Sequence, residues 1–510
     1  MRKVVVIGGG HNGLVCGAYL ARAGYDTTLL ERDKILGGAA RTEEVWEGIK
    51  TSRASYLLSL MPEKIKRELE LERHGLEILE RNPSGLSLFP DGSYLAFHGD
   101  PAELRTEIAK FSEADADAYP AYEANLAAIG RAIEPAMLRP PPSLESMPSL
   151  AWDSVVNRKL WDHRFTLTDL MGMSGSEFLD QWFESEQLKS VLATDAVICA
   201  WLGPQDPGSA YVLLHHVMGE TGGKAGVWGY VRGGMGEVSN SIARAGEEHG
   251  LTILRESPVA QIVLDDRKRA KGVRLENGSY LPADAVVCCA SPRAMCRMLD
   301  GEMDEAYEKR VMRTSYKNGN AKINLVLNAL PQFTCDPPED FLRGTIHISP
   351  TVEYLQVAFD EARHGDMSSS PMIEMTIPST LDDTLAPNGL WVANIFTQYL
   401  SWEASDRKDA YRERVIDIID ENAPGFRDSI VQKEILSPQD LQNIMGLDEG
   451  NAFHGGMGLA SLGPMRPVPG YADFTTPIDR LFLGGSGAHP GGGVTGMPGH
   501  NAAQKVIQTV

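Results

Sequence analysis

This sequence contains few cysteines, fewer basic than acidic residues, and no long apolar run. Its six cysteines include no Cys-x-x-Cys pair, which argues against a disulfide-reductase centre and against a thiolate zinc site. The 48 Lys and Arg residues against 69 Asp and Glu leave a net charge of −21. Nucleic acid is therefore a poor partner, because binding to phosphates needs a basic face. We also expect no metal site.

The sequence shows no targeting or membrane-spanning segment. No apolar stretch approaches the ~20 residues of a transmembrane helix. The first strand begins within a few residues of Met1 and leaves no room for a signal or transit peptide. Because few cysteines in a long chain are typical of a reducing compartment, we expect a cytoplasmic protein. Residues 147–174 mix Trp, Leu, Met and basic side chains. That mixture is compatible with peripheral membrane contact, although a lid or packed helix is the simpler interpretation.

The N-terminus carries a phosphate-binding pattern. Residues 3–7 read KVVVI, a short buried strand, and run directly into GGGHNG. Gly8, Gly10 and Gly13 occupy the glycine positions of G-x-G-x-x-G. The first allows the tight turn, the second lets a pyrophosphate approach the backbone, and the third lets the helix lie close to the strands. A helix that begins at Asn12 would direct its free N–H groups at the phosphates.

An acid ends the strand that follows. Residues 26–30 read DTTLL, and Glu31 comes directly after them. At this position of a dinucleotide-binding fold a carboxylate accepts hydrogen bonds from the adenosine ribose. Strand, glycines, helix, second strand and acid occur in the required order. We therefore predict a Rossmann-like dinucleotide site rather than a chance glycine turn.

The next residues indicate which dinucleotide binds. Arg32 is followed by GGAAR at 37–41, which resembles the second motif of the large FAD family that includes amine oxidases and carotenoid desaturases. The resemblance implies a non-covalent FAD, with the backbone of Gly38 and Ala39 close to the flavin side and Arg41 near the pyrophosphate. The alternative is an ordinary glycine turn with a surface arginine.

The last forty residues resemble the other half of an FAD site. A strand at 480–483 leads into GGSGAHPGGGVTGMPGHNAA at 484–503. In this family the last motif is a strand, a glycine turn and a helix whose N-terminus faces the flavin pyrimidine ring. That helix end stabilises negative charge on the reduced ring. The resemblance assigns the contacts in this turn to Gly485, Ser486, Gly493, Val494 and Thr495.

Further motifs indicate which branch of the family this sequence resembles. Amine oxidases usually place an acid where this chain has Gly487. The stretches GSGAHPGGGVTG, FHGGM at 453–457 and RPVPGY at 466–471 resemble the carotenoid desaturase (phytoene desaturase) branch and, more closely, the pyridine nucleotide-disulfide oxidoreductase domain-containing protein 2 type. The Gly-Gly-Met-Gly turn at 233–236 resembles a helix start of the FAD domain, so we expect no nicotinamide domain. Val259 lies where relatives bond the adenine through a valine backbone.

These motifs predict an α/β protein with a Rossmann-like FAD-binding domain of the amine-oxidase (GR2) type and an inserted α+β substrate domain. We assign residues 1–60, 222–300 and 465–510 to the FAD-binding domain, and residues 61–221 and 301–464 to the substrate domain. The alternation of apolar residues in the latter suits a sheet with one covered face. We predict its strands at 322–327, 354–359, 371–377 and 391–399, and a helix at about 403–422.

The candidates for catalysis are histidines in the family motifs. FAD accepts hydride at its N5 atom, and the protein must position a C–H bond and remove a proton. His454 and His489 lie in motifs expected near the ring, where each is either a base or a residue that fixes a loop. Arg53 either points toward the ring or lies on the surface. His215 and His216 face different ways on a helix, which makes them a poor metal pair.

Three functions remain open. The first is a desaturase, dehydrogenase or isomerase that acts on an apolar or extended small molecule. The second is an amine oxidase, which is weakened by Gly487 and by the lack of an obvious substrate-binding acid or covalent flavin anchor. The third is a non-enzymatic relative such as the Rab-escort proteins, against which the intact glycine motif, Glu31 and Arg41 argue. An oligomer is compatible with the sequence.

Overall fold

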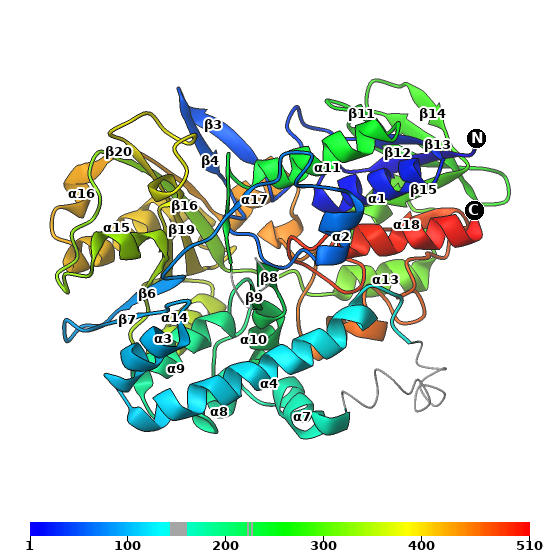
Figure 1. Cartoon of the computed structure of the whole chain (residues 1–510). Helices are drawn as coiled ribbons and strands as arrows, with labels where there is room; N and C mark the ends of the chain where they lie inside the picture. The colour runs from blue at the N-terminus through cyan, green and yellow to red at the C-terminus, as the bar shows by residue number, and fades with distance from the viewer. Residues whose placement is uncertain (143–160, 222–223, 226–227) are drawn as a thin grey trace.

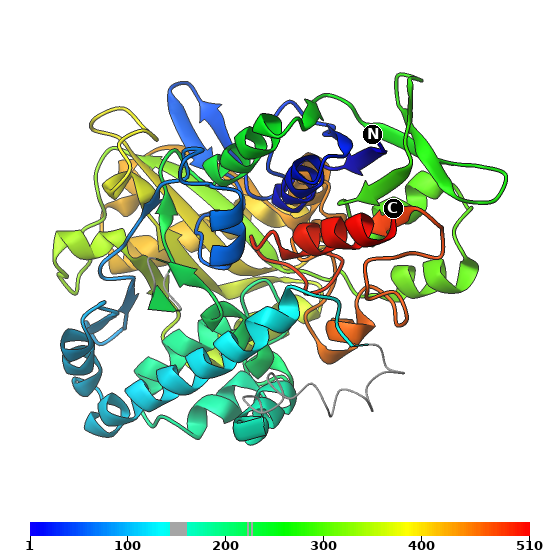
Figure 2. The same cartoon turned by 45° about the vertical axis from the view of Figure 1, so that its right-hand side comes forward.

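The computed structural model describes residues 1–142, 161–221, 224–225 and 228–510. Figures 1 and 2 show two sheets side by side, with a group of helices packed beneath them. One sheet has five strands and carries both chain termini at its side of the molecule; the other has seven strands. The expected α/β fold with a Rossmann-like parallel sheet is confirmed.

The five-stranded sheet is assembled from segments spread over the whole chain. Its order is β11-β2-β1-β15-β21, and every neighbouring pair is parallel. Its central strands are apolar along almost their entire length because both faces of such a sheet are covered. The strands are β1 Lys3–Ile7, β2 Asp26–Leu30, β11 Thr252–Leu254, β15 Ala285–Cys288 and β21 Leu481–Leu483.

Three helices pack together beside this sheet: α1 His11–Arg22, α11 Gly236–Glu248 and α18 Met497–Thr509. α1 lies between the other two and is buried at every residue except Arg22. In both views α1, in dark blue, lies next to α18, in red. The first and last helices of the chain are therefore direct neighbours.

Smaller elements surround the parallel sheet. A three-stranded antiparallel sheet lies beside it, built from β12 Val259–Leu264, β13 Ala270–Leu275 and β14 Tyr280–Pro282. The remaining helices here are α2 Glu63–Glu68, α12 Pro292–Leu299 and α13 Glu305–Arg313. Paired short strands are β3 Thr42–Trp46 with β4 Ile49–Ser52, β5 Ile78–Leu79 with β10 Tyr230–Val231, and β8 Glu220–Thr221 with β9 Lys224–Ala225.

The seven-stranded sheet has the order β20-β16-β19-β18-β17-β6-β7. Its pairs are antiparallel except β17 with β6. The strands are β6 Gly85–Leu88, β7 Tyr94–Ala96, β16 Asn320–Leu327, β17 Thr345–Ile348, β18 Met367–Thr376, β19 Trp391–Leu400 and β20 Ile430–Leu436. Register neighbours Ile323, Ile395 and Met375 share a core with α15 (Lys408–Asn422), so that helix covers one face. The opposite face looks toward the helical group.

The helical group consists of α3 Pro101–Ala109, α4 Glu113–Met137, α7 Arg164–Gly172, α8 Gly175–Asp180, α9 Glu186–Asp195 and α10 Ser209–Val217. α3 begins after its N-cap Asp100, whose side chain accepts hydrogen bonds from the backbone N–H groups of Ala102 and Glu103. Helices α16 Phe426–Ser429 and α17 Pro438–Met445 lie near β20.

One predicted strand is wrong. Residues 354–359 belong to a helix, α14 (Val352–Arg363), whose N-cap Thr351 accepts a hydrogen bond from Tyr354 N. The buried residues Val352, Leu355 and Phe359 follow a helical spacing. The six residues 354–359 alone are too few to show that spacing. The other three strands and the helix predicted for this sheet are present as β16, β18, β19 and α15.

The segment 147–174 is only partly described, since residues 147–160 lie outside the described residues. Next to that gap, Trp161 and Phe165 are 66% and 70% exposed. Among the helices that the structure describes, none is both long and apolar enough to cross a bilayer.

Candidate functional site

The turn between β1 and α1 is shaped to receive an anion. Gly8 has a φ of +103°, where a side chain would be strained. A Cβ atom on Gly13 would lie 1.9 Å from the Gly8 carbonyl oxygen. α1 has Gly10 as its N-cap and, within the described chain, neither a side-chain cap nor an acid in its first turn. Its N–H groups and positive dipole end are therefore available to a phosphate.

Glu31 lies at the end of β2, beside this turn. Its Oε2 accepts a hydrogen bond from Gly9 N at 2.7 Å, and its Oε1 accepts one from Asp33 N at 2.9 Å. The Glu31 carbonyl accepts a bond from Ser257 N at 2.8 Å, which brings the start of β12, at Val259, close to the acid. The carboxylate is thus fixed next to the glycine turn.

The C-terminal helix meets α1 at a glycine. A Cβ atom on Gly499 of α18 would lie 1.9 Å from the Asn12 carbonyl oxygen, so the two helices can approach this closely only without a side chain there. Like α1, α18 has a glycine N-cap, Gly496, and none of its described residues places an acid in the first turn. Two helix N-termini of the same kind therefore lie in one region.

Side chains bridge the two glycine turns. Asn12 Nδ2 donates to Ser486 Oγ at 3.1 Å, and His11 Nε2 lies 3.0 Å from the Gly493 carbonyl oxygen. The buried Asn12 Oδ1 has no hydrogen-bond partner among the residues described. A buried acceptor without a donor is costly, and it fits a site that receives a hydrogen-bonding ligand.

The remaining predicted cofactor residues lie around these turns. Gly37 N donates to the Gly9 carbonyl at 2.8 Å, which places the 37–41 motif against the first turn. A Cβ atom on Gly38 would lie 3.4 Å from Gly10 Cα, and one on Gly485 would lie 2.4 Å from the Cys289 carbonyl oxygen. Ala39 and Val494 line a large cavity, and Thr495 Oγ1 accepts a hydrogen bond from Met497 N at 3.1 Å.

The N-terminus of α11 is bonded to more protein hydroxyls than that of α1, which has no side-chain cap, or that of α18, where Thr495 accepts one bond. Met235 N donates to Ser52 Oγ at 3.0 Å, and Gly236 N donates to Thr42 Oγ1 at 2.9 Å. The N–H groups at this helix end are therefore already bonded to protein hydroxyls, and an anion would have to displace them. This agrees with a structural role for the Gly-Gly-Met-Gly turn.

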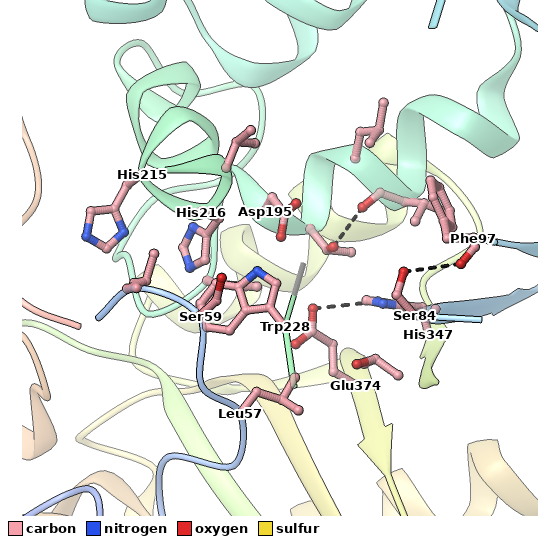
Figure 3. Close-up of a pocket in the computed structure, with 18 of the residues that line it drawn as sticks. Leu57, Ser59, Ser84, Phe97, Asp195, His215, His216, Trp228, His347 and Glu374 are labelled. Atoms are coloured by element: carbon pink, nitrogen blue, oxygen red, sulfur yellow. Dashed lines mark hydrogen bonds and ion pairs between the residues drawn. The ribbon is translucent and has the colours of Figure 1, made fainter. Parts of the chain in front are cut away.

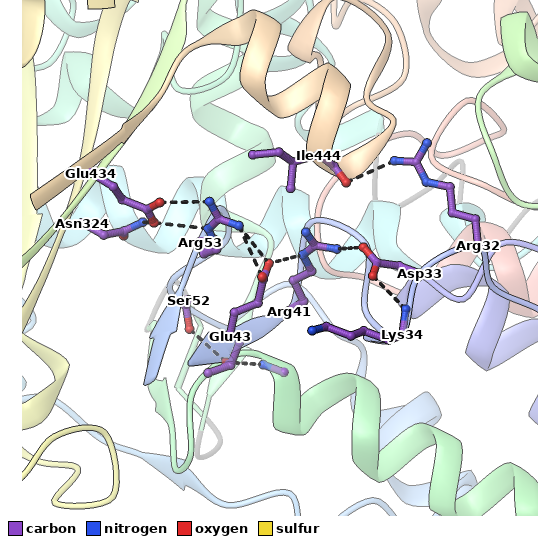
Figure 4. A network of polar contacts seen from close by, with 12 residues as sticks. Arg32, Asp33, Lys34, Arg41, Glu43, Ser52, Arg53, Asn324, Glu434 and Ile444 are labelled. Carbon is purple, nitrogen blue, oxygen red and sulfur yellow. Dashed lines mark hydrogen bonds and ion pairs between the residues drawn. The ribbon is translucent and has the colours of Figure 1, made fainter. Parts of the chain in front are cut away.

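The predicted arginines lie in a polar network, shown in Figure 4. The buried Arg41 donates from Nη1 to Asp33 at 2.8 Å, and its Nε lies 2.6 Å from Glu43. Arg53 pairs with Glu43 at 3.3 Å and with Glu434 of β20 at 2.9 Å, so it links the hairpin β3–β4 to the seven-stranded sheet. Arg32 donates to the Ile444 carbonyl at 3.1 Å.

Arg466 connects the two motifs that precede the last strand. Its guanidinium is 2% exposed and donates to the carbonyl oxygens of Gly456 at 2.9 Å, Ser461 at 3.1 Å and Ser486 at 2.7 Å, and also to that of Phe453. The segments 453–457 and 466–471 are therefore held against the C-terminal glycine turn by one side chain. Arg466 begins one of the motifs noted in the sequence, but no role was predicted for this arginine.

The predicted catalytic histidines lie near this arginine. His454 lines a small pocket with Arg466, and neither His454 nor His489 is among the described residues that line the large cavity. Burial lowers the pKa of each to about 4. The structure therefore gives neither histidine a contact with the large cavity, and their catalytic role stays a prediction.

A cavity of about 1140 Å³ joins the cofactor motifs to the seven-stranded sheet. At one end it is lined by His11, Ala39 and Val494. It then extends along α4, α9 and α10 to the face of the sheet opposite α15, as Figure 3 shows in part. Its lining is rich in aromatic and aliphatic side chains, among them Phe97, Tyr119, Tyr122, Leu126, Ile198 and Phe396.

Charged groups occupy the sheet wall of this cavity. Glu374 of β18 accepts a hydrogen bond from the Tyr56 hydroxyl at 2.7 Å, and Lys322 of β16 has its Nζ atom 3.9 Å from the centre of the Tyr56 ring. Burial raises the pKa of Glu374 to about 7 and places that of Lys322 well below its ordinary value. Each is a charged residue within a buried stretch of strand, and this sequence signal was not used in the prediction.

The helical wall contributes an acid and two histidines (Figure 3). Burial raises the pKa of Asp195, at the end of α9, to about 7. His216 of α10 stacks on Trp228 with ring centres 6.0 Å apart, and His215 Nε2 lies 3.2 Å from the Gly492 carbonyl. In the part of the chain that is described, no three His, Cys, Asp or Glu residues are grouped as metal ligands.

The chain matches a known family and several known proteins. Residues 13–320 match the family Flavin containing amine oxidoreductase. Over 99% of this chain and 93% of the relative, the sequence is 40% identical to Pyridine nucleotide-disulfide oxidoreductase domain-containing protein 2 of Rattus norvegicus. It is 26% identical to Phytoene desaturase (lycopene-forming) of Pseudescherichia vulneris, over 98% of this chain and 97% of that one.

The fold is also similar to solved structures. Putrescine oxidase bound to putrescine superposes with a TM-score of 0.63 at 15% identity, over 99% of this chain and 98% of the other. The glycine turns, the two helix N-termini without a side-chain cap and the unpartnered Asn12 Oδ1 fit a dinucleotide. On these grounds the chain belongs to the flavin containing amine oxidoreductase family, its cofactor is FAD, and it is an oxidoreductase.

Proposed function

We propose that this protein is an FAD-dependent dehydrogenase or desaturase that removes hydride from an apolar or extended small molecule. The observation that carries the proposal is the cavity of about 1140 Å³, which begins at the predicted flavin contacts Ala39 and Val494 and is lined largely by aromatic and aliphatic side chains. Histidines and charged residues also line the cavity, and its aromatic and aliphatic surface fits the apolar part of a small-molecule ligand. The similarity to a phytoene desaturase supports the same class of substrate.

We propose that the two uncapped helix ends hold the cofactor without a covalent bond. The α1 N-terminus would bind the pyrophosphate, Glu31 the adenosine ribose, and the α18 N-terminus the pyrimidine edge of the flavin. The contacts would come from Gly8, Gly10, Asn12, Gly13, Glu31, Arg32, Gly38, Ala39, Arg41, Val259, Gly485, Ser486, Gly493, Val494 and Thr495.

When bound, FAD supplies the hydride acceptor at N5. The residues of this chain would position the substrate and accept its proton. The aromatic walls would exclude water, the sheet wall would orient the substrate, and an acid or histidine would take up the proton. Glu374 and Asp195 are the acids in the cavity whose pKa values lie near 7, which suits proton exchange at neutral pH. His454 and His489 remain the candidates from the family motifs.

The domain division is also a proposal. The strands of the parallel sheet fall in residues 1–60, 222–300 and 465–510, and those of the seven-stranded sheet fall in 61–221 and 301–464. This distribution supports one cofactor domain and one substrate domain. The small number of cysteines supports a cytoplasmic location. Peripheral membrane contact and oligomer formation stay predictions.

A second candidate is an amine oxidase. The sequence alone offered no substrate-binding acid, but Glu374 and Asp195 both line the cavity. Either carboxylate could bind a substrate ammonium group. Anaerobic titration of the purified holoenzyme distinguishes the two candidates. We expect polyenes or other apolar substrates to bleach the flavin absorbance and amines to leave it unchanged; bleaching by amines alone would replace the desaturase proposal with the oxidase.

A further inference from the structure

One wall of the cavity is a single row of side chains across the seven-stranded sheet. In register, Lys322 of β16 lies opposite Phe396 of β19, Phe396 opposite Glu374 of β18, and Glu374 opposite His347 of β17. Residues paired in this way share one face of a sheet, and all four line the cavity. The sheet therefore presents Lys322 on one side of the Phe396 ring, and Glu374 followed by His347 on the other side.

Most polar groups of this wall already have partners. Glu374 accepts the Tyr56 hydroxyl bond at 2.7 Å, and its other oxygen lies 3.5 Å from His347 Nδ1 (Figure 3). Arg81 donates to Thr345 Oγ1 at 2.7 Å and to the Trp228 carbonyl at 2.9 Å. Neither the carboxylate nor the guanidinium needs a ligand to satisfy it.

Among the described sheet residues that line the cavity, Lys322 Nζ, His347 Nδ1 and Asn320 Oδ1 lack a hydrogen-bond partner, and of these Lys322 can donate most hydrogen bonds to an anion. It is 2% exposed, and its Nζ atom has no hydrogen-bond partner among the described residues. Its Nζ atom lies over the face of the Tyr56 ring, and burial lowers the pKa of this amino group by more than the charge of Glu374 raises it. A buried amino group with three donors and no acceptor is costly. An oxygen atom supplied by a ligand in the cavity would remove that cost.

We propose that this wall binds the carboxylate of an otherwise apolar substrate, with Lys322 as the donor. Burial disfavours the charged form of Lys322, and a ligand carboxylate beside it would favour that form, as the Glu374 carboxylate already does. A substrate ammonium group would instead meet Lys322 and find Glu374 already bonded to Tyr56. The aromatic remainder of the cavity would hold the apolar chain. This inference rests on the proposed function and adds a substrate class to it: an apolar organic acid.

Calorimetric titration of the holoenzyme with three probes of equal chain length tests the inference. The probes are dodecanoate, dodecanol and dodecylamine, each below its micelle concentration. We expect dodecanoate to bind at least about tenfold more tightly than dodecanol, because a charge-assisted hydrogen bond is stronger than a neutral one. Lys322→Met should abolish this preference and leave dodecanol binding unchanged. Lys309→Met, at an exposed position of α13, should behave like the wild type.

Several results would overturn the inference: dodecylamine binding most tightly, equal binding of all three probes, no binding, or a carboxylate preference that survives in Lys322→Met. The wild-type series alone decides the first three, even if the variant does not fold. The visible spectrum of each preparation reports bound FAD independently. A wild-type holoenzyme that contains FAD but shows no carboxylate preference would therefore refute this subsite, whereas absence of FAD would refute the proposed function itself.

Discussion

The glycine at the first turn of α1 gives the sharpest test of the cofactor site. In Gly13→Ala the new Cβ would lie 1.9 Å from the Gly8 carbonyl oxygen, 3.1 Å from the Gly8 carbonyl carbon and 3.4 Å from Cys289 Cβ. The first contact is with backbone, which cannot rotate away as a side chain can. The turn must therefore move by about 1 Å or more to restore an ordinary contact, and overpacking of this kind costs ~1–3 kcal/mol.

The same backbone is the predicted cradle of the FAD pyrophosphate, so the displacement should weaken cofactor binding. At about 1.4 kcal/mol per tenfold change, a cost of ~1–3 kcal/mol corresponds to a loss of roughly ten- to a hundredfold in FAD affinity. The assay is the flavin absorbance per mole of purified protein, followed by titration of FAD into apoprotein.

Gly172→Ala is the matched control. Gly172 is the exposed last residue of α7, and a Cβ there meets nothing within 4 Å among the described atoms. The same substitution should leave FAD binding unchanged, with stability altered by no more than ~1 kcal/mol. Gly13→Ala protein that keeps FAD at wild-type affinity would refute the assignment of this turn to the cofactor.

Two further predictions concern stability. Burial raises the pKa of Asp195 from 3.8 to about 7. Between these pH values the folded protein keeps a proton on Asp195 that the unfolded chain releases. This group therefore destabilises the folded state increasingly as the pH rises toward 7. Asp195→Asn should raise the free energy of unfolding by about 1–3 kcal/mol at pH 8 and by less at pH 5, seen as a larger rise of the thermal midpoint at pH 8; an equal gain at both pH values would contradict this. Arg53→Met should destabilise by ~1–3 kcal/mol, because Glu43 and Glu434 lose their shared partner, and the additional Glu434→Gln change should recover part of that loss in thermal denaturation.

The cofactor half of the fold could be predicted because its signals are local. Gly8, Gly10 and Gly13 lie within six residues of one another, and the chemistry of a turn depends on residues that are neighbours in sequence. The alternation of apolar residues likewise located β16, β18 and β19. The same alternation led to a wrong strand at α14, because six residues are too few to distinguish a strand from one and a half turns of helix.

The substrate wall could not be predicted in this way. Lys322 and Glu374 are 52 residues apart and share a wall only because both pair with Phe396 in β19. Asp195 joins them from a different helix. Each position has a local signal, a charge within a buried element, but its neighbours in space depend on strand register.

The most direct test of the account is the visible spectrum of the protein purified without added cofactor, recorded before and after denaturation. We predict an oxidised-flavin spectrum from the native protein and release of about one FAD per chain on denaturation, because the described site holds FAD without a covalent bond. A colourless protein that neither takes up FAD nor gains thermal stability from it would contradict the central claim that this chain is an FAD-dependent oxidoreductase.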